Sequence, residues 1–481
     1  MKSFHTMNAV LKTTPPRILP KRTPLRSWSG LLLGMVLLVS GAMADDAGKN
    51  DGGRKSLEQR IAELETKLKD AGAGGGVKGS GIKISGFIDT SYLVNLADRT
   101  ETGPVAGSSG QNTGRVFDNQ YDGFNLNAVW LTIQKDIDAS KFPAGFRVDT
   151  IIGQDASSYR GLAANESTVL LGIAYIDLAI PVGNGIDVKI GKVGQSLTAY
   201  EAIPSPANWQ FSRSTTFALE PWLQTGARFS YKWNDTITTT VGLVNGWDAA
   251  SSSLNQNTDL AFEGRVDING PKTSFGDFSA FVGGFYGNGD TTPTALGGTT
   301  TAALDRPTSY VITVGGTWLK PFDVKPLALG FEFLNRSTET AVAATGAAAL
   351  AGNVVNQIVP IGANSVSAYG KWDWNKWTST SARGTYTAFQ NNRATGVSGN
   401  PISLDGLAVQ TGTAGRPSNT ELFGFTLTQA FNVWKDTLVR LEWRHDWTPS
   451  DQVGFGTANA ASHDDIRKDQ DTLAVNVVYS F

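Results

Sequence analysis

The feature that most constrains the fold of this chain is a two-residue alternation of apolar and polar side chains between Ile82 and Phe481. Successive side chains of a β-strand point to opposite faces, so this alternation predicts strands with one apolar and one polar face. Alternating segments of about ten residues, separated by turn-rich stretches, are typical of transmembrane β-barrels. Sixteen such segments are expected, at residues 82–97, 123–136, 142–155, 167–180, 184–195, 222–233, 236–247, 258–269, 275–286, 308–320, 323–335, 364–375, 376–390, 418–433, 436–447 and 469–481.

The connections between these segments alternate in length. Seven are short turns and eight are long loops. An even-stranded barrel with both termini in the periplasm requires this arrangement, whereas a β-sandwich has no reason for so regular an alternation. We therefore predict an all-β fold, a 16-stranded antiparallel transmembrane β-barrel over residues 82–481. The short turns are expected at residues 137–141, 181–183, 234–235, 270–274, 321–322, 375–376 and 433–435.

Tryptophans gather near the ends of the expected strands. Tryptophan favours the membrane–water boundary, so a membrane barrel is expected to carry one girdle at each boundary. Tryptophans that fill a soluble core are the alternative, but that reading does not explain the clustering at strand ends. Trp247 and Trp447 border long loops, and the residues near short turns are Trp233, Trp318, Trp372, Trp374, Trp377 and Trp434.

Strand parity places many charged residues on one face. Arg147 and Asp149, for example, share a face opposite Phe146 and Val148. An Arg on the lipid-facing side near mid-membrane would cost about 2 to 4 kcal/mol, so the charged face is expected to point into a water-filled lumen. The residues predicted to line the pore wall are Arg147, Asp149, Arg228, Lys232, Glu263, Arg265, Asp267, Glu332, Arg383, Arg440, Glu442 and Arg444.

Residues 1–44 are expected to be a secretory signal peptide that is removed from the mature protein. Six basic residues and no acidic ones precede the apolar run from Leu31 to Val39, and the small residues Ala42 and Ala44 follow it. This order predicts export and cleavage near Ala44. A single membrane anchor is the alternative, but the apolar run is about half as long as a membrane span.

Composition excludes several classes of function. The chain has no Cys and three His, too few for a structural zinc site, an iron–sulfur cluster or a haem attachment, so neither a metal nor a cofactor is expected. Loss of the six basic residues of the signal changes the charge balance from 41 minus 43 to 35 minus 43, a net charge of −8. No nucleic-acid partner is expected for so acidic a chain.

Residues 45–81 are expected to form a short periplasmic helix and a Gly-rich linker. Leu57, Ile61, Leu64 and Leu68 recur at heptad spacing, which is typical of a coiled coil. A helix this short is unstable alone, so copies from neighbouring chains are expected to cover its apolar stripe. We therefore predict a homotrimer that assembles through the barrel and residues 57–68. A helix docked on its own barrel, or a partly disordered one, is the alternative.

Several short motifs resemble a known family. They span the barrel, about 400 residues, and they are the strand from Ile84 to Tyr92 (ISGFIDTSY), Ile190–Lys192, residues 206–214 (PANWQFSRS), Thr225–Arg228 and Val244–Asp248. They resemble the outer-membrane β-barrel porins described as OmpL-like, and this resemblance implies a diffusion porin of the bacterial outer membrane, in contact with its lipid. The terminal Phe481 looks like the signal that such barrels present to the barrel assembly machinery.

The leader and the heptad helix also look like those of trimeric porins with N-terminal coiled coils, such as phosphate- or sugar-selective ones. Phosphate-selective porins carry a ladder of lumen Arg and Lys, whereas the lumen face here has about equal numbers of acids and bases. The resemblance therefore does not imply strong anion selectivity.

The similarity to general porins also implies a role for the third outer loop, residues 196–221. In general porins this loop folds inward and narrows the channel, and Tyr200, Glu201, Arg213 and Glu220 are the corresponding candidates here. Opposed charges across a narrow aqueous gap discriminate between ions. A surface loop that its prolines merely stiffen is the alternative.

Other functions find less support in the sequence. A serine hydrolase needs a histidine base, but His445 falls on the apolar face and His463 in a loop, so an enzyme is not expected. The roughly 37 residues before the barrel are too few for the plug of an active transporter. The alternative that stays open is a structural or partner-anchoring barrel, such as a sheath for an electron carrier. The expected function is passive diffusion of small hydrophilic solutes and ions.

Overall fold

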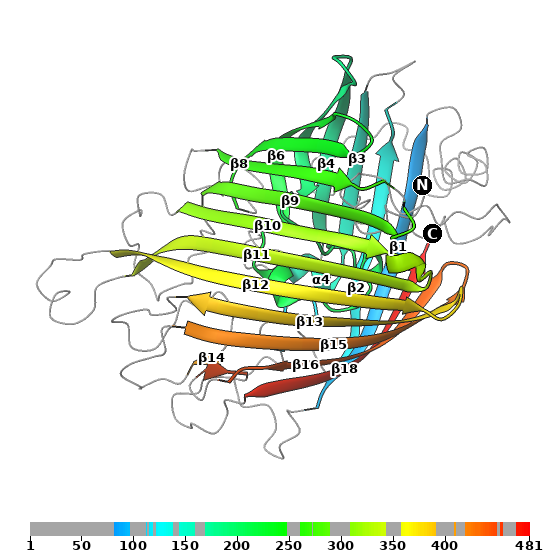
Figure 1. The fold of residues 1–481 in the computed structure, drawn as a ribbon, viewed down its shortest axis with the longest axis vertical. Coiled ribbons are helices and arrows are strands. Elements are labelled where there is room, and N and C mark those ends of the chain that lie inside the picture. The colour runs from blue at the N-terminus through cyan, green and yellow to red at the C-terminus, as the bar shows by residue number, and fades with distance from the viewer. Residues whose placement is uncertain are drawn as a thin grey trace, which may run out of the picture.

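Sixteen antiparallel strands close into one barrel, with β18 (red) beside β1 (blue) (Figure 1). The chain is seen here as a computed structural model that describes residues 81–96, 112, 115–118, 122–137, 144–158, 169–247, 260–271, 273–288, 308–342, 357–390, 408–409, 419–449, 453–455 and 468–481. The wall strands are β1 (Ile82–Asn95), β2 (Gly123–Lys135), β3 (Ala144–Ile152), β4 (Val169–Ile180), β5 (Ile186–Gln195), β6 (Leu223–Lys232), β7 (Ile237–Val244), β8 (Ala261–Asn269), β9 (Asp277–Asn288), β10 (Thr308–Leu319), β11 (Leu327–Val342), β12 (Gln357–Asp373), β13 (Thr378–Gln390), β15 (Asn419–Trp434), β16 (Thr437–Trp447) and β18 (Asp469–Ser480).

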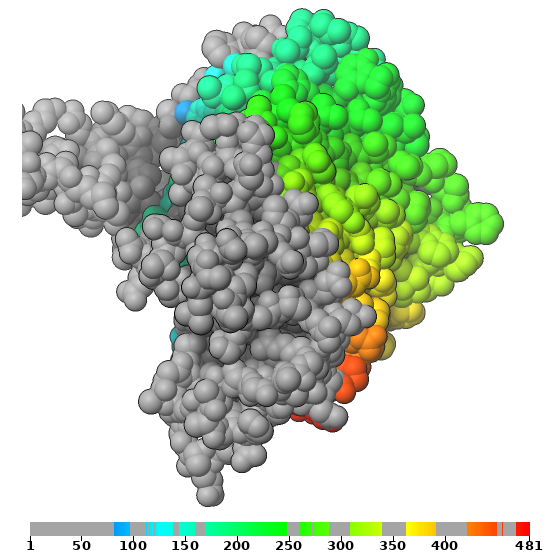
Figure 2. Space-filling view, turned by 90° about the vertical axis from the view of Figure 1, so that its left-hand side faces the viewer, coloured from blue at the N-terminus to red at the C-terminus, as the bar shows by residue number. Residues whose placement is uncertain are grey.

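The predicted barrel is confirmed strand by strand. Each wall strand pairs with the wall strands before and after it in the chain, so the colour in Figure 2 passes in order from green through yellow to orange along the wall. The last residue takes part in closing the barrel. Phe481 and Gly86 exchange two backbone hydrogen bonds, of 2.9 and 3.0 Å. No edge strand is left exposed in the wall, because β1 and β18 pair along nine residues of each strand.

The largest departure from the expected strands is in the β11–β12 hairpin, where β11 runs on to Val342 and β12 begins already at Gln357. Residues 357–361 pair with β11 alone, because the pairing of β12 with β13 begins only at Gly362. Pro360 has no amide hydrogen to donate, and an edge position such as this one tolerates it. A second addition is a two-stranded sheet outside the wall, made of β14 (Ala408–Val409) and β17 (Val453–Gly454).

The two faces of the wall differ as the alternation predicts. On β16, Leu441 and Trp443 are exposed on the outer face, whereas Arg440, Glu442 and Arg444 are buried inside the barrel. The predicted tryptophan girdle near the short turns is present, because Trp233, Trp372, Trp374, Trp377 and Trp434 are all exposed there.

Trp247 was expected at the opposite boundary, and this expectation is wrong. Strand β7 ends at Val244, and the chain turns at Gly246 with a φ of +131°, so Trp247 packs inside the barrel. Its ring lies edge-on to Phe285 at 5.5 Å and below the Arg336 guanidinium at 4.0 Å.

Within the described ranges, two short α-helices lie in loops, α4 (Gln154–Ser158) and α5 (Thr215–Ala218). Among the described residues, no helix has the length and apolar character needed to cross a membrane. The predicted signal peptide (residues 1–44) and the predicted coiled-coil helix (residues 57–68) lie outside the described residues.

Candidate functional site

The connection between β5 and β6, residues 196–222 and called here the inner loop, crosses the interior of the barrel. It makes hydrogen bonds to inward-facing side chains of β8, β10, β11, β12, β13 and β16. Strand β16 lies nine strands from β6 in one direction around the wall and seven in the other, so it is almost opposite the strand into which the loop leads. The inner loop therefore spans the width of the barrel.

Wall arginines hold the main chain of the inner loop. The Arg265 guanidinium donates hydrogen bonds to the carbonyl oxygens of Leu197 (3.1 Å) and Ala199 (2.9 Å). On the opposite wall, Arg440 donates to the carbonyl of Gln210 at 2.9 Å. Its neighbour on the same face, Arg444, donates to the carbonyl of Arg213 at 2.7 Å. These carbonyl groups of the loop are buried inside the barrel, and the wall arginines give them the hydrogen bonds that water would otherwise supply.

Wall and loop carboxylates complete the attachment. Glu442 accepts hydrogen bonds from the amides of Phe211 (2.6 Å) and Ser212 (3.0 Å). Glu201, which the sequence singles out in the loop, forms an ion pair of 2.8 Å with Arg383, and both side chains are 1% exposed. Arg383 also donates to the Ser212 carbonyl at 2.6 Å. Many of the charged wall residues that were predicted to face water therefore bind the inner loop.

Tyr200 packs against the wall at a point where two neighbouring strands, β10 and β11, carry glycine. Its hydroxyl lies 3.0 Å from Thr317 Oγ1, and its ring packs against Phe281 and Tyr369. A Cβ atom on Gly330 would lie 2.1 Å from the Tyr200 hydroxyl, and one on Gly315 would lie 3.2 Å from the ring. Tyr200 therefore fits against the wall only because residue 330 is a glycine.

The end of the inner loop is held by hydroxyl groups and by α5. The Ser214 side chain caps α5 by accepting the Phe217 amide at 3.1 Å. Thr216 Oγ1 lies 2.7 Å from Ser365 Oγ and 2.8 Å from Ser367 Oγ on β12. Glu220 is fully buried, and burial raises its pKa to about 8.

Arg213, the remaining candidate of the loop, stabilises the loop itself. Its guanidinium donates to the carbonyls of Phe211 (3.0 Å) and Ile203, and it stacks over the Phe117 ring at 4.7 Å. Phe117 belongs to the β1–β2 connection and also contacts Phe217. A second outer connection therefore meets the inner loop inside the barrel.

Most of the other predicted wall residues form ion pairs with an opposite charge. Arg147 and Asp149 pair with each other at 2.8 Å on the inner face of β3. Arg228 pairs with Glu263 at 2.6 Å, and Arg265 pairs with Asp267 at 2.9 Å. Lys232 is exposed at the short turn after β6, where it pairs with Asp235, and Glu332 is buried on β11 and accepts a hydrogen bond from Tyr369.

The sequence interpretation missed several residues of this attachment. Arg336 donates to the Leu219 carbonyl at 3.2 Å, but the predicted strand stopped one residue before it. Extending the parity of Glu332 by four positions would have placed Arg336 on the inner face. Arg115 and Asp118 form a buried ion pair in the β1–β2 connection that reaches Asp446. That segment has no periodicity that could have revealed it.

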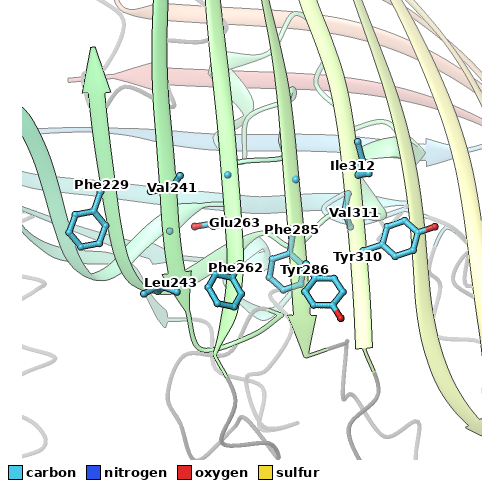
Figure 3. Close-up of a pocket in the computed structure, with 13 residues that line it drawn as sticks. Phe229, Val241, Leu243, Phe262, Glu263, Phe285, Tyr286, Tyr310, Val311 and Ile312 are labelled. Atoms are coloured by element: carbon cyan, nitrogen blue, oxygen red, sulfur yellow. The ribbon is translucent and has the colours of Figure 1, made fainter. Parts of the chain in front are cut away.

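A separate apolar groove of about 860 Å³ lies on the outer face of the wall (Figure 3). Gly264 and Gly284 face each other across β8 and β9, so no side chain fills its floor. Exposed aromatic rings of Phe229, Phe262 and Tyr286 flank it. The groove opens away from the interior and is no part of a path through the barrel.

The part of the chain that the structure describes contains no assembled metal site. No group of three or more His, Cys, Asp or Glu side chains is arranged there to hold a metal ion. His445 lies on the outer face of β16, with Nδ1 3.1 Å from Asp471 Oδ1 and its ring between Trp443 and Trp447.

A closed barrel that is apolar outside, charged inside and crossed by an inward loop is the architecture of a porin-like outer-membrane channel. Residues 81–481 match the family described as "Putative beta-barrel porin-2, OmpL-like". The chain belongs to this family of outer-membrane β-barrel porins, so the resemblance in its motifs is confirmed. Family and fold indicate a channel rather than an enzyme.

Several solved structures are similar to this chain at low sequence identity. The anion-selective porin from Comamonas acidovorans is 11% identical, with a TM-score of 0.50 over 83% of this chain and 99% of that chain. The outer membrane channel DcaP of Acinetobacter baumannii is 11% identical, with a TM-score of 0.49 over 83% and 97%. OprB of Pseudomonas putida is 11% identical, with a TM-score of 0.47 over 88% and 97%. A comparison with curated proteins finds no sequence match.

Proposed function

We propose that the protein is a passive diffusion channel for small hydrophilic solutes and ions, and that its inner loop narrows the aqueous path. The observation that carries this proposal is the crossing of the interior by residues 196–222, held to opposite walls by Arg265 and Arg440. A sixteen-stranded barrel is wide enough for an aqueous channel unless something inside narrows it. A loop that is fixed at both walls supplies such a narrowing.

Selectivity between ions is proposed to be weak. Most charged side chains of the inner face that the structure describes are paired with an opposite charge, as in Arg228 with Glu263 and Arg383 with Glu201. A paired lining presents little net charge to a passing ion, whereas strongly selective pores present rings of one sign. Neither cations nor anions therefore gain a large advantage.

Export, membrane contact and assembly complete the proposal. Cleavage near Ala44 releases the mature chain to the periplasm, and Phe481 serves as the signal to the barrel assembly machinery. Outer-membrane lipid covers the apolar outer face, including the groove between Phe229 and Tyr310. Three copies associate through their barrels and through residues 57–68.

Planar-bilayer recording of purified protein tests the channel proposal. We expect stable conductance steps, in groups of three for a trimer, and a reversal potential near zero in a salt gradient. The protein can be shown to be folded by the change in its electrophoretic migration on heating. Folded protein that gives no conductance steps even at high concentration would contradict passive diffusion. That result would favour a barrel that only anchors a partner.

A further inference from the structure

Two carboxyl groups meet where the inner loop touches β11. Glu220 belongs to the loop and Glu332 to the wall, and both are almost completely buried. One oxygen of each has a donor: Thr198 Oγ1 donates to Glu220 Oε2 at 2.9 Å, and Tyr369 Oη donates to Glu332 Oε2 at 3.3 Å. The Oε1 atoms of both groups have no donor among the described residues. The two side chains lie within hydrogen-bonding reach of each other.

This geometry requires a proton between the two groups. An ionised carboxylate only accepts hydrogen bonds, so two facing carboxylates repel each other. When one of them is protonated, its O–H donates to the other and both unsatisfied oxygens are satisfied at once. Two carboxyl groups at contact in a site shielded from water cannot both be ionised without a large cost, so the pair keeps at least one proton, which the two groups share.

No neighbouring cation among the described residues offsets the repulsion that the two carboxylates would have without that proton. From the loop, Glu201 faces the pair and adds negative charge, and Tyr200 lies beside it. Two cations approach from the wall, but Arg265 on β8 pairs with Asp267 and with loop carbonyls, and Arg383 on β13 pairs with Glu201. The remaining titratable neighbour is Tyr369 on β12, which donates its hydroxyl hydrogen to Glu332.

We propose that the proton shared by Glu220 and Glu332 is a latch that holds the inner loop against β11, and that its loss in alkaline solution releases the loop. The latch is a property of the loop, and only its effect on conductance rests on the proposed function. Deprotonation replaces one hydrogen bond by repulsion between two buried charges at the point where the loop returns to β6.

The pH range of the latch follows from the loop residue. Burial raises the pKa of Glu220 from its ordinary value of 4.5 to about 8. The docked loop therefore keeps a proton that a released loop loses, so docking is strongest below pH 4.5 and weakens until the pH passes about 8. Between pH 7 and pH 9.5 these two pKa values predict a decrease of about tenfold in the docking equilibrium constant.

Cysteine labelling tests the latch without relying on conductance. The chain has no cysteine, and Thr215 at the start of α5 is buried when the loop is docked. In a Thr215→Cys background in detergent, we expect a water-soluble methanethiosulfonate to react about ten times faster at pH 9.5 than at pH 7, after correction for the reaction with free cysteine. The double variant Glu220→Gln with Glu332→Gln keeps an amide-to-amide hydrogen bond but has no shared proton, so its corrected rate should not change with pH.

The matched control is Glu421→Gln, which makes the same change at an exposed carboxylate that accepts a hydrogen bond from Tyr386. It should keep the tenfold rise. A corrected rate that does not change with pH in the parent background, or a rise that persists in the double glutamine variant, would overturn the latch. Conductance of the same samples separates the two proposals. Labelling that behaves as expected in a protein that never conducts leaves the latch standing and removes the diffusion channel.

Discussion

Arg383→Met should release the inner loop, and the structure sets the size of the effect. The Arg383 guanidinium binds the Glu201 carboxylate at 2.8 Å and the Ser212 carbonyl at 2.6 Å, and both charged side chains are 1% exposed. Methionine keeps most of the apolar stem and removes the charge, so Glu201 is left buried without its cation. Breaking one side of a buried ion pair costs about 3 to 5 kcal/mol. A penalty of that size shifts the equilibrium between docked and released loop at least about 100-fold toward release.

Single-channel recording is the assay for this variant. We expect larger and noisier conductance steps than in the parent protein. Adding Glu201→Gln should recover part of the docking, because glutamine leaves no unpaired charge behind. The control is Arg147→Met, which breaks an equally short ion pair, the one with Asp149 on β3. Among the described residues, this pair makes no hydrogen bond to the inner loop. Conductance that is unchanged in Arg383→Met, or changed equally in Arg147→Met, would refute the attachment of the loop by wall charges.

Three further predictions concern the wall, the oligomer and assembly. Gly330→Ala should displace Tyr200 and raise conductance, since the new Cβ would lie 2.1 Å from the tyrosine hydroxyl, whereas Gly370→Ala, which meets no atom within 4 Å, should behave as the parent protein. Deletion of residues 56–70 should lower the temperature at which the trimer dissociates in mild detergent, and unchanged trimer stability would end the coiled-coil hypothesis. Deletion of Phe481 should reduce the fraction of heat-modifiable, folded barrel in the outer membrane; an equal yield would show that this residue is dispensable for assembly.

The wall could be predicted from the sequence because its physics is local. A strand at a membrane must alternate, and a charge on the lipid side is costly, so parity alone places Arg440, Glu442 and Arg444 on the inner face. All sixteen strands were expected, most of them within about three residues of their observed ends. Strand ends were wrong where the contrast between faces fades. The extension of β12 contains Pro360 and Gly362, which resemble a break in a strand when neither pairing partner is known.

The site was less predictable because its contacts join residues far apart in the chain. Parity shows that Arg265 points inward, but not that it binds the carbonyl of Ala199 rather than water. The same limit applies to Glu220 and Glu332, which are separated by about 110 positions and meet only when the inner loop crosses to β11. Glu220 was expected to supply charge to the channel, and the sequence could not show that it becomes buried or that this burial raises its pKa.

The central claim is that a water-filled barrel is narrowed by residues 196–222. The most direct measurement compares the single-channel conductance of the parent protein with that of a variant in which residues 199–218 are replaced by a short Gly–Ser linker. We expect that both proteins conduct and that the shortened variant conducts several-fold more. Equal conductance in the two proteins would contradict the narrowing by this loop, and two folded but silent proteins would contradict the channel.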